Sequence, residues 1–250
     1  MTFSETLKAR ILTAESVCVL TGAGISAESG VPTFRGEEGL WKKFKPEELA
    51  NFEAFIRNPN LVWEWYAYRR KLIHDVKPNP GHYALVELER SVKEFTLITQ
   101  NVDNLHRRAG SRSIIELHGN IERSYCIECG ARVSELNIDS LKEAPRCGRC
   151  GGLIRPDVVW FGEMLPQEAF SAAEKAARQC DLFLCIGTSA VVYPAASLPF
   201  TAFDHGAFIV EINRELTELS SRAHETLIGP AGEILPQLVP WFRRNKGNTP

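Results

Sequence analysis

The chain turns from apolar to glycine-rich at Thr21-Gly22-Ala23-Gly24-Ile25-Ser26-Ala27-Glu28-Ser29-Gly30-Val31-Pro32-Thr33-Phe34-Arg35-Gly36. The run before it, Ser16-Val17-Cys18-Val19-Leu20, is short and β-branched, which predicts a buried parallel strand. Gly22 and Gly24 allow a tight turn beside a pyrophosphate, and Ala27 takes the third position of a G-x-G-x-x-G/A fingerprint. The stretch therefore predicts the phosphate cradle of a dinucleotide-binding fold, although a glycine turn after a strand is also ordinary chain punctuation.

Length and composition describe a protein of ordinary charge. The chain has 250 residues, a formal net charge of -2 and 24% charged residues, which suits one main domain with a smaller inserted one. Its first residues lack the apolar core of a secretory signal, and no run approaches the ~18 apolar residues that span a bilayer. We therefore expect a cytoplasmic protein that binds neither a membrane nor nucleic acid directly.

The remaining chain alternates strand-like and helical patterns. A helix is expected at residues 4–14, a helical insertion without strands at 37–76, and a crossover helix at 81–90. Strand-like runs follow at residues 95–99, 114–117, 181–186 and 207–212, with helical patterns at 167–178 and 195–203. Alternation of this kind predicts an α/β fold, a doubly wound Rossmann-like parallel sheet.

Polar residues or glycines end every predicted strand. Because ligands bind at the carboxyl ends of such strands, we expect one crevice lined by Gly22, Gln100, Asn101, His118, Gly187, Thr188, Ser189 and Asn213. The predicted dinucleotide-binding domain comprises residues 1–36, 77–118 and 158–250. The smaller inserted domain combines a helical module at 37–76 with a metal-binding module at 119–157.

Two Cys-x-x-Cys pairs, Cys126/Cys129 and Cys147/Cys150, are separated by seventeen residues, a spacing typical of a four-cysteine zinc ribbon. Four thiolates close a tetrahedron and leave no position for water, so we predict one structural Zn²⁺. A redox dithiol fits two such pairs poorly, and a nucleic-acid ribbon would carry a denser basic face. The other cysteines, Cys18, Cys180 and Cys185, lie in or beside strand-like runs and are expected to be buried, reduced thiols.

Four longer segments of the sequence are more specific than the glycines alone. The stretch from Gly22 to Arg35 resembles the signature of the sirtuins, which are NAD-dependent protein deacylases. Three further segments fit the same family: Thr99-Gln100-Asn101-Val102-Asp103-Asn104-Leu105-His106, Leu117-His118-Gly119, and Val158-Val159-Trp160-Phe161-Gly162-Glu163. The resemblance covers the chain from about Glu5 to Trp241.

The resemblance implies NAD as co-substrate and His118 as the catalytic base, a role that suits an imidazole with a pKa of ~6.5. The acyl-lysine oxygen would attack the ribose carbon that bears nicotinamide. His118 would then deprotonate a ribose hydroxyl, and the acyl group would leave on ADP-ribose. Asn101 is implied to be catalytic as well, orienting the ribose and a water. Without the resemblance, His118 could be a satisfied structural histidine, and Asn101 and Asp103 could simply form a turn.

The resemblance also implies the residues that bind NAD. These are Gly22, Ala23, Gly24, Ile25, Ala27, Glu28, Thr33, Phe34, Arg35, Trp41, Gln100, Asn101, Val102, Asp103, His118, Gly187, Thr188, Ser189, Asn213, Arg214, Glu215 and Ala231. The protein substrate would bind as an extended peptide against Val159, Trp160, Phe161 and Gly162, which we predict to be a strand with an aromatic residue exposed at its end.

Tyr66 and Arg69 indicate the acyl group. On a helix they share a face, and they match the Tyr-x-x-Arg of sirtuins that remove succinyl, malonyl and related acidic acyl groups. A guanidinium and a hydroxyl suit a carboxylate. For an arbitrary Tyr-x-x-Arg, an amphipathic helix with surface groups is the commoner explanation. We predict a desuccinylase or demalonylase that retains deacetylase activity.

Other functions remain as alternatives. They are a plain deacetylase in which Tyr66 and Arg69 are structural, a minor ADP-ribosyltransferase activity, an NAD-dependent dehydrogenase, and a non-catalytic NAD-sensing or zinc-ribbon adaptor. Release of nicotinamide, as opposed to absorbance of NADH, separates a deacylase from a dehydrogenase.

Overall fold

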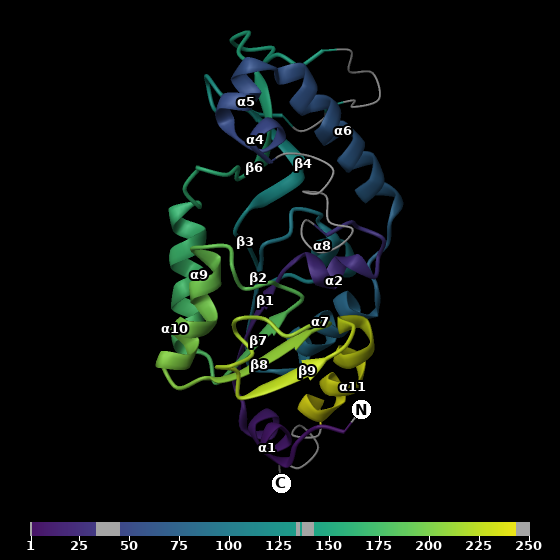
Figure 1. Cartoon of the computed structure of the whole chain (residues 1–250), viewed down its shortest axis with the longest axis vertical. Coiled ribbons are helices and arrows are strands. Elements are labelled where there is room, and N and C mark those ends of the chain that lie inside the picture. The colour runs from purple at the N-terminus through teal and green to yellow at the C-terminus, as the bar shows by residue number, and fades with distance from the viewer. Residues whose placement is uncertain (1, 34–45, 134–135, 137–142, 244–250) are drawn as a thin grey trace.

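The computed structural model describes residues 2–33, 46–133, 136 and 143–243. Phe34, Arg35 and Trp41, three of the residues implied to bind NAD, lie outside these ranges. Figure 1 shows an elongated molecule with a large sheet and its helices toward one end and a smaller module at the other. In the described part of the chain, no helix has the length and apolar character needed to cross a bilayer.

The large sheet has six parallel strands in the order β3-β2-β1-β7-β8-β9. Their bounds are β1 Ser16–Thr21, β2 Glu94–Thr99, β3 Ile114–Glu116, β7 Leu182–Ile186, β8 Phe208–Asn213 and β9 Glu225–Ile228. The chain leaves β1 toward β2 and β3, and it returns to pair β7 with the other side of β1. This reversal beside β1 is the switch point at which doubly wound sheets bind ligands.

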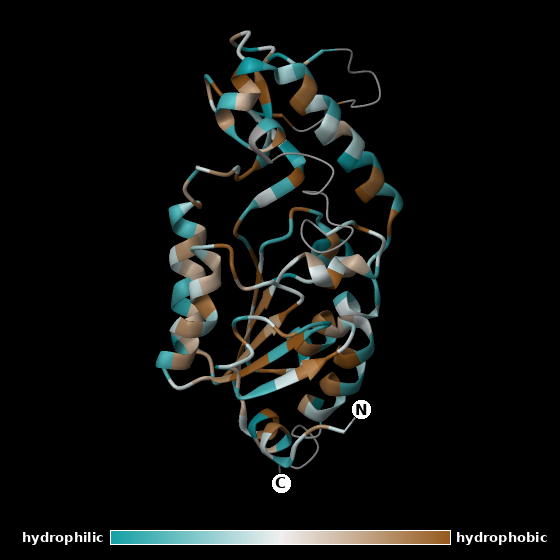
Figure 2. Cartoon of the chain, in the orientation of Figure 1, coloured by the Kyte–Doolittle hydropathy of each residue, from teal (hydrophilic) through white to brown (hydrophobic). Residues whose placement is uncertain are grey.

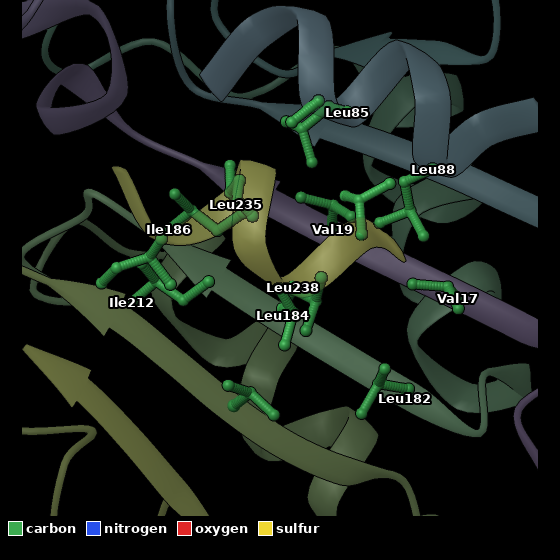
Figure 3. Packing of buried hydrophobic residues seen from close by; sticks show 14 of the residues in the cluster. Val17, Val19, Leu85, Leu88, Leu182, Leu184, Ile186, Ile212, Leu235 and Leu238 are labelled. Atoms are coloured by element: carbon green, nitrogen blue, oxygen red, sulfur yellow. The ribbon is translucent and has the colours of Figure 1, made fainter. Parts of the chain in front are cut away.

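Helices cover both faces of the sheet because successive side chains of its strands alternate between the two faces. Val17 and Val19 of β1 pack under α1 (Glu5–Thr13), α7 (Pro80–Ser91) and α11 (Ala231–Arg243). Figure 3 shows Leu85 and Leu88 of α7 and Leu235 and Leu238 of α11 over β1 and β7. Cys18 and Leu20 face the opposite side, toward α9 (Gln167–Gln179), η2 (Ala195–Ser197) and α10 (Leu198–Asp204). Figure 2 shows the resulting apolar band along the strands.

The smaller module joins two separate segments of the chain. It contains α4 (Pro46–Leu49), α5 (Phe52–Arg57), α6 (Pro59–Asp75) and an antiparallel sheet of order β5-β4-β6, with β4 Gly119–Cys126, β5 Arg132–Val133 and β6 Ile154–Val158. One apolar cluster unites these elements, and Trp63 Nε1 donates a 2.7 Å hydrogen bond to the Ile154 carbonyl. Asn51 and Asn58 accept hydrogen bonds at the starts of α5 and α6, which fixes where these helices begin.

The elements that the sequence did not predict include α8 (Leu105–Ala109), β9, α11, the short helix α2 (Ala23–Ala27) and the three strands of the smaller sheet. The strand β9 is short, lies at the sheet edge and is largely half-buried, so its hydrophobic pattern is weak. The helix α11 carries Pro236 and Pro240, which argue against a helix when read locally. Tertiary packing overrides that local signal, because the apolar face of α11 rests on α7 and on the sheet.

Candidate functional site

A cleft of about 1590 Å³ opens at the carboxyl ends of β1, β2, β7 and β8 and extends to α6 in the smaller module. Most of the predicted NAD-binding residues that the structure describes line it: Gly22, Ala23, Gly24, Ala27, Thr33, Gln100, Asn101, Val102, His118, Gly187, Thr188, Ser189, Asn213, Arg214, Glu215 and Ala231. The predicted substrate-binding residues Tyr66, Arg69, Val159, Trp160, Phe161 and Gly162 also line it. The predicted crevice is therefore confirmed.

Three predicted residues do not line this cleft. Ile25 does not line it and is fully buried in the apolar cluster that α7 and α11 form with the sheet. Glu28 Oε1 accepts a 3.0 Å hydrogen bond from the backbone of Gly232, which ties α2 (Ala23–Ala27) to the first turn of α11. Asp103 is buried behind the cleft wall, where its Oδ1 accepts from the Leu105 amide at 2.9 Å.

Gly22 and Gly24 lie in the loop after β1, where the loop after β7 approaches too closely to leave room for a side chain. A Cβ at Gly22 would lie 2.7 Å from Thr188 Cβ, and one at Gly24 would lie 2.7 Å from Gly187 Cα. The amides of Gly22 and Gly24 donate to the carbonyls of Ile186 and Gly187 at 3.0 and 2.7 Å. These two amides therefore hold the β1 and β7 loops together, instead of facing an anion as the sequence alone suggests.

Asn101 is held by its side-chain amide. Its Nδ2 donates to the Gly22 carbonyl at 3.0 Å and to Ser26 Oγ at 3.2 Å, and its backbone amide donates to Thr99 Oγ1 at 3.0 Å. Both Nδ2 hydrogens are thus used within the protein. The carbonyl oxygen Oδ1 is left to accept a hydrogen bond from a ligand hydroxyl or a water. Ser26 and Thr99 were not singled out from the sequence, where a buried hydroxyl gives no periodic signal.

A buried polar chain lies behind Asn101. The hydroxyl of Thr21 is 2.9 Å from Thr99 Oγ1 and 2.9 Å from His106 Nε2. The His106 ring lies 4.8 Å from the ring of His82. Burial lowers the pKa of His82 to about 4 and holds the pKa of His106 well below its ordinary value. Both imidazoles are therefore neutral at pH 7 and support the cleft floor without adding charge.

His118 is oriented as a base. Its Nδ1 lies 2.9 Å from the Gln100 carbonyl, and because a carbonyl only accepts, Nδ1 carries the hydrogen. Nε2 is then left unprotonated in the neutral ring. Burial lowers the pKa of His118, and the bond to Gln100 opposes that shift. An imidazole held neutral at pH 7, with one nitrogen fixed, can accept a proton from a ligand.

Gly119 explains how His118 is placed. Its φ of +81° lies in the left-handed region, and a Cβ there would be 2.2 Å from the Asp157 carbonyl. The chain therefore turns sharply after His118 and enters β4 close to β6. Val159 donates its amide to the His118 carbonyl at 2.9 Å, so His118 is held from both sides of this crossing.

The four predicted zinc ligands come together. The Sγ atoms of Cys126, Cys129, Cys147 and Cys150 all lie within 4.8 Å of one another. Zn–S bonds of ~2.3 Å place tetrahedral thiolates about 3.8 Å apart, so the cluster fits one structural Zn²⁺. Backbone N–H groups of Arg149 and Cys150 lower the pKa of Cys147 to about 7, which favours the thiolate that a metal needs. Cys18, Cys180 and Cys185 are buried, as predicted.

The predicted strand at residues 159–162 is wrong. The strand β6 ends at Val158, and a turn follows in which Gly162 has φ +84°. Trp160 is only 2% exposed, whereas Phe161 is 49% exposed. Two hydrogen bonds close this turn: the Glu163 amide donates to the Trp160 carbonyl at 3.1 Å, and the Trp160 amide donates to the Glu163 carboxylate at 2.8 Å.

Tyr66 and Arg69 lie on one face of α6, as predicted, and both line the cleft. They are 3% and 8% exposed, so they are not the surface groups of an ordinary amphipathic helix. The Arg69 guanidinium packs 4.8 Å from the Trp65 ring centroid and 5.8 Å from that of Tyr66. A buried cation and a phenol therefore face the same cavity as His118.

This fold and cleft define a doubly wound nucleotide-binding protein with an added metal-binding module. A family model described as "Sir2 family" matches residues 22–194. An NAD-dependent protein deacylase of Aquifex aeolicus is 51% identical over 233 residues, which are 93% of this chain and 98% of that protein. NAD-dependent protein deacylase 2 of Pyrobaculum aerophilum is 54% identical over 237 residues, 94% of this chain and 95% of its own. The chain belongs to the Sir2 family, the sirtuins.

Solved structures agree with this assignment. A mutant Sir2 homologue in complex with ADP-ribose superposes with a TM-score of 0.94 at 44% identity, over 99% of this chain and 100% of its own. A Sir2 homologue bound to NAD gives 0.91 at 45% identity, over 97% and 95%. A Sir2 mutant with a deacetylated p53 peptide and 3′-O-acetyl ADP-ribose gives 0.87 at 35% identity, over 96% and 98%.

Proposed function

We propose that this protein is an NAD-dependent protein-lysine deacylase that prefers acyl groups carrying a carboxylate, such as succinyl and malonyl, and retains deacetylase activity. The coarser activity, NAD-dependent protein deacylation, is that of the family and of the relatives that share half of its sequence. The observation that carries the finer proposal is the buried Tyr66 and Arg69 pair on the wall of the cleft that also holds His118.

NAD fits the cleft floor that the sheet provides. It supplies an electrophilic ribose carbon and a leaving group, while the protein positions the reactants and manages protons. The Gly22 and Gly24 loop, the Gly187–Ser189 loop and Asn213 are proposed to hold it, with Oδ1 of Asn101 oriented toward a ribose hydroxyl or a water. Gln100 and Asn213 both hydrogen bond Thr188, at 2.9 and 3.0 Å, so this rim is pre-organised.

His118 is the proposed catalytic base. Nδ1 of His118 carries the ring hydrogen and donates a hydrogen bond to the Gln100 carbonyl, so Nε2 can accept a proton from a ribose hydroxyl. The hydroxyl oxygen is then free to attack the acyl carbon. The proposed chemistry links no protein side chain covalently to the substrate, so it requires no nucleophilic side chain beside His118.

Arg69 and Tyr66 are proposed to bind the acyl carboxylate. Burial raises the pKa of Tyr66, so the phenol stays protonated and can donate a hydrogen bond. A guanidinium in a water-poor site binds a carboxylate more strongly than it would at the surface, whereas an acetyl methyl gains nothing from either group. A plain deacetylase would have little use for a buried cation at this position.

The acylated peptide is proposed to lie along residues 159–162, beside the cleft mouth. Support comes from the exposed Phe161 at that edge and from the peptide-bound Sir2 structure. We also propose that residues 1–36, 77–118 and 158–250 form the NAD-binding domain and that 37–76 and 119–157 form the smaller domain, because the two sheets have separate apolar clusters. The buried, reduced cysteines support a cytoplasmic location.

The test compares succinyl-, malonyl- and acetyl-lysine versions of one peptide with the native protein and with Arg69→Met. The native protein should show the higher kcat/KM on the acidic acyl groups. Arg69→Met removes the charge but keeps much of the volume, so desuccinylation should fall by roughly 10²-fold while deacetylation is spared, because a hydrogen bond to a charged group contributes about 1.5–3 kcal/mol. Equal losses on both substrates would mean that Arg69 is structural and the protein a plain deacetylase.

A further inference from the structure

The indole of Trp160 is hydrogen bonded to Tyr66. Trp160 Nε1 donates to the Tyr66 hydroxyl oxygen at 2.8 Å, across 94 residues of sequence, and both side chains are buried on the wall of the cleft. An indole nitrogen only donates, so the Tyr66 oxygen must be the acceptor in this bond. The hydrogen of the Tyr66 hydroxyl is therefore directed elsewhere, and among the residues that the structure describes it has no recorded acceptor.

The Trp160 ring cannot easily turn away from Tyr66. The guanidinium of Arg155 lies 3.5 Å from the Trp160 ring centroid, and Phe55 packs against the ring with centroids 5.2 Å apart. Arg155 is itself fixed, because its Nη2 donates to Glu163 Oε2 at 2.9 Å and to the Val158 carbonyl at 2.8 Å. The same Glu163 oxygen holds the Trp160 backbone amide at 2.8 Å. The ring and the backbone of Trp160 are thus both held by one partly buried ion pair, Arg155–Glu163.

Tyr66 is held just as firmly on its other side. The Trp65 ring meets it edge to face with centroids 4.8 Å apart, and Arg69 lies against the same ring. Because the Tyr66 ring is held on both sides, only rotation about its C–O bond, which sets the direction of the hydroxyl hydrogen, remains free. With the indole occupying one side of the oxygen as a donor, that hydrogen must avoid Trp160 and is free for a ligand in the cleft.

We propose that Trp160 is a positioning residue for acyl selectivity: its indole N–H fixes the Tyr66 hydroxyl so that the hydroxyl hydrogen is presented to the carboxylate of the acyl group. The proposal rests on the proposed preference for acidic acyl-lysine and adds the residue that orients its hydroxyl donor. Arg69 supplies charge, Tyr66 supplies the hydrogen, and Trp160 decides where that hydrogen points.

The contact to the acyl carboxylate is far from the bonds that change. It is made equally in the ground state and the transition state, so its loss should raise KM and leave kcat nearly unchanged. Trp160→Phe keeps an aromatic ring against Arg155 and Phe55 but removes the N–H. We expect the ratio of kcat/KM for succinyl-lysine to that for acetyl-lysine to fall about threefold to tenfold, the net effect of one hydrogen bond, through the KM of the succinyl peptide.

A double-mutant cycle tests whether Trp160 acts through Tyr66. Tyr66→Phe removes the hydroxyl, so adding Trp160→Phe to it should not reduce the ratio further. Trp63→Phe is the matched control: Trp63 lies in the same apolar cluster and loses an equivalent bond, 2.7 Å from Nε1 to the Ile154 carbonyl, but it does not line the cleft. It should lower thermal stability and leave the succinyl-to-acetyl ratio as in the native protein.

Each outcome of these measurements supports or refutes the role of Trp160. If Trp160→Phe keeps the native ratio, or lowers it equally with and without Tyr66, the role of Trp160 is refuted while acidic selectivity stands. If the native protein shows no preference for succinyl over acetyl, acidic selectivity itself is wrong, and the role of Trp160 falls with it. A fall in the ratio that disappears in the Tyr66→Phe background supports the proposal.

Discussion

Gly119→Ala tests whether position 119 needs glycine only for its left-handed backbone conformation or also because a side chain there would clash with β6. Gly119 has φ +81°, which costs a side chain about 1–2 kcal/mol, and its new Cβ would lie 2.2 Å from the Asp157 carbonyl. Ordinary contact begins at 3.4 Å, so β4 and β6 must separate by about an ångström, an overpacking that typically costs a further 1–3 kcal/mol. The total is roughly 2–5 kcal/mol.

The matched control is Gly206→Ala. Gly206 has a similar φ of +89°, with no atom within 4 Å of the added Cβ, and it lies between α10 and β8, away from the cleft. It should carry only the conformational cost of about 1–2 kcal/mol. For a chain of this size, each kcal/mol lowers Tm by ~2–4 °C, so differential scanning calorimetry can resolve the two variants.

Activity gives the sharper distinction. A shift of about 1 Å at His118 costs on the order of 10²-fold in rate, so Gly119→Ala should lose that much kcat/KM at a temperature where it is fully folded. Gly206→Ala should keep native kcat/KM. If the two variants lose equal stability and both remain active, then Asp157 and its strand yield easily, and the claim that Gly119 positions His118 is refuted.

Four further results are expected. His118→Ala should fold normally by circular dichroism, bind zinc and lose about 10²–10⁴-fold in deacylation, and near-native turnover would remove its assignment as the base. Because burial lowers the pKa of His118 below 6.5, kcat/KM should hold as pH falls to 6.5 and drop only at more acidic pH; a limb above 6.5 would contradict this. His82 has a pKa of about 4 in the folded protein, so as the pH falls the unfolded chain binds the proton first. About 3 kcal/mol of the free energy of unfolding that is present above pH 6.5 should therefore be lost between pH 6.5 and 4. Urea titrations should show a smaller loss for His82→Gln than for the native protein. Metal analysis of reduced protein should give one zinc per chain, and Cys147→Ser should lose it and lower the Tm; zinc-free, fully stable native protein would contradict the structural role.

Much of the site was readable from the sequence because its signals are local. The glycine stretch after an apolar strand, each Cys-x-x-Cys pair and each change from an apolar strand to a polar end is a pattern of only a few consecutive residues. Parallel strands then bring their carboxyl ends to one edge without further information. The spacing of Tyr66 and Arg69 likewise places both on one helical face, which the structure confirms.

Other features depend on contacts between distant segments, and only the tertiary structure decided them. The helix α11 forms despite two prolines because its apolar face has the sheet to cover, and Gly22 and Gly24 are required by the approach of the loop at Gly187. Trp160 is buried, and not exposed at a strand end, because Tyr66, 94 residues earlier in the sequence, and Phe55 pack against its ring. Local patterns reveal which residues can react, whereas the direction in which His118 and Tyr66 present their hydrogens depends on partners that only folding brings within hydrogen-bond distance.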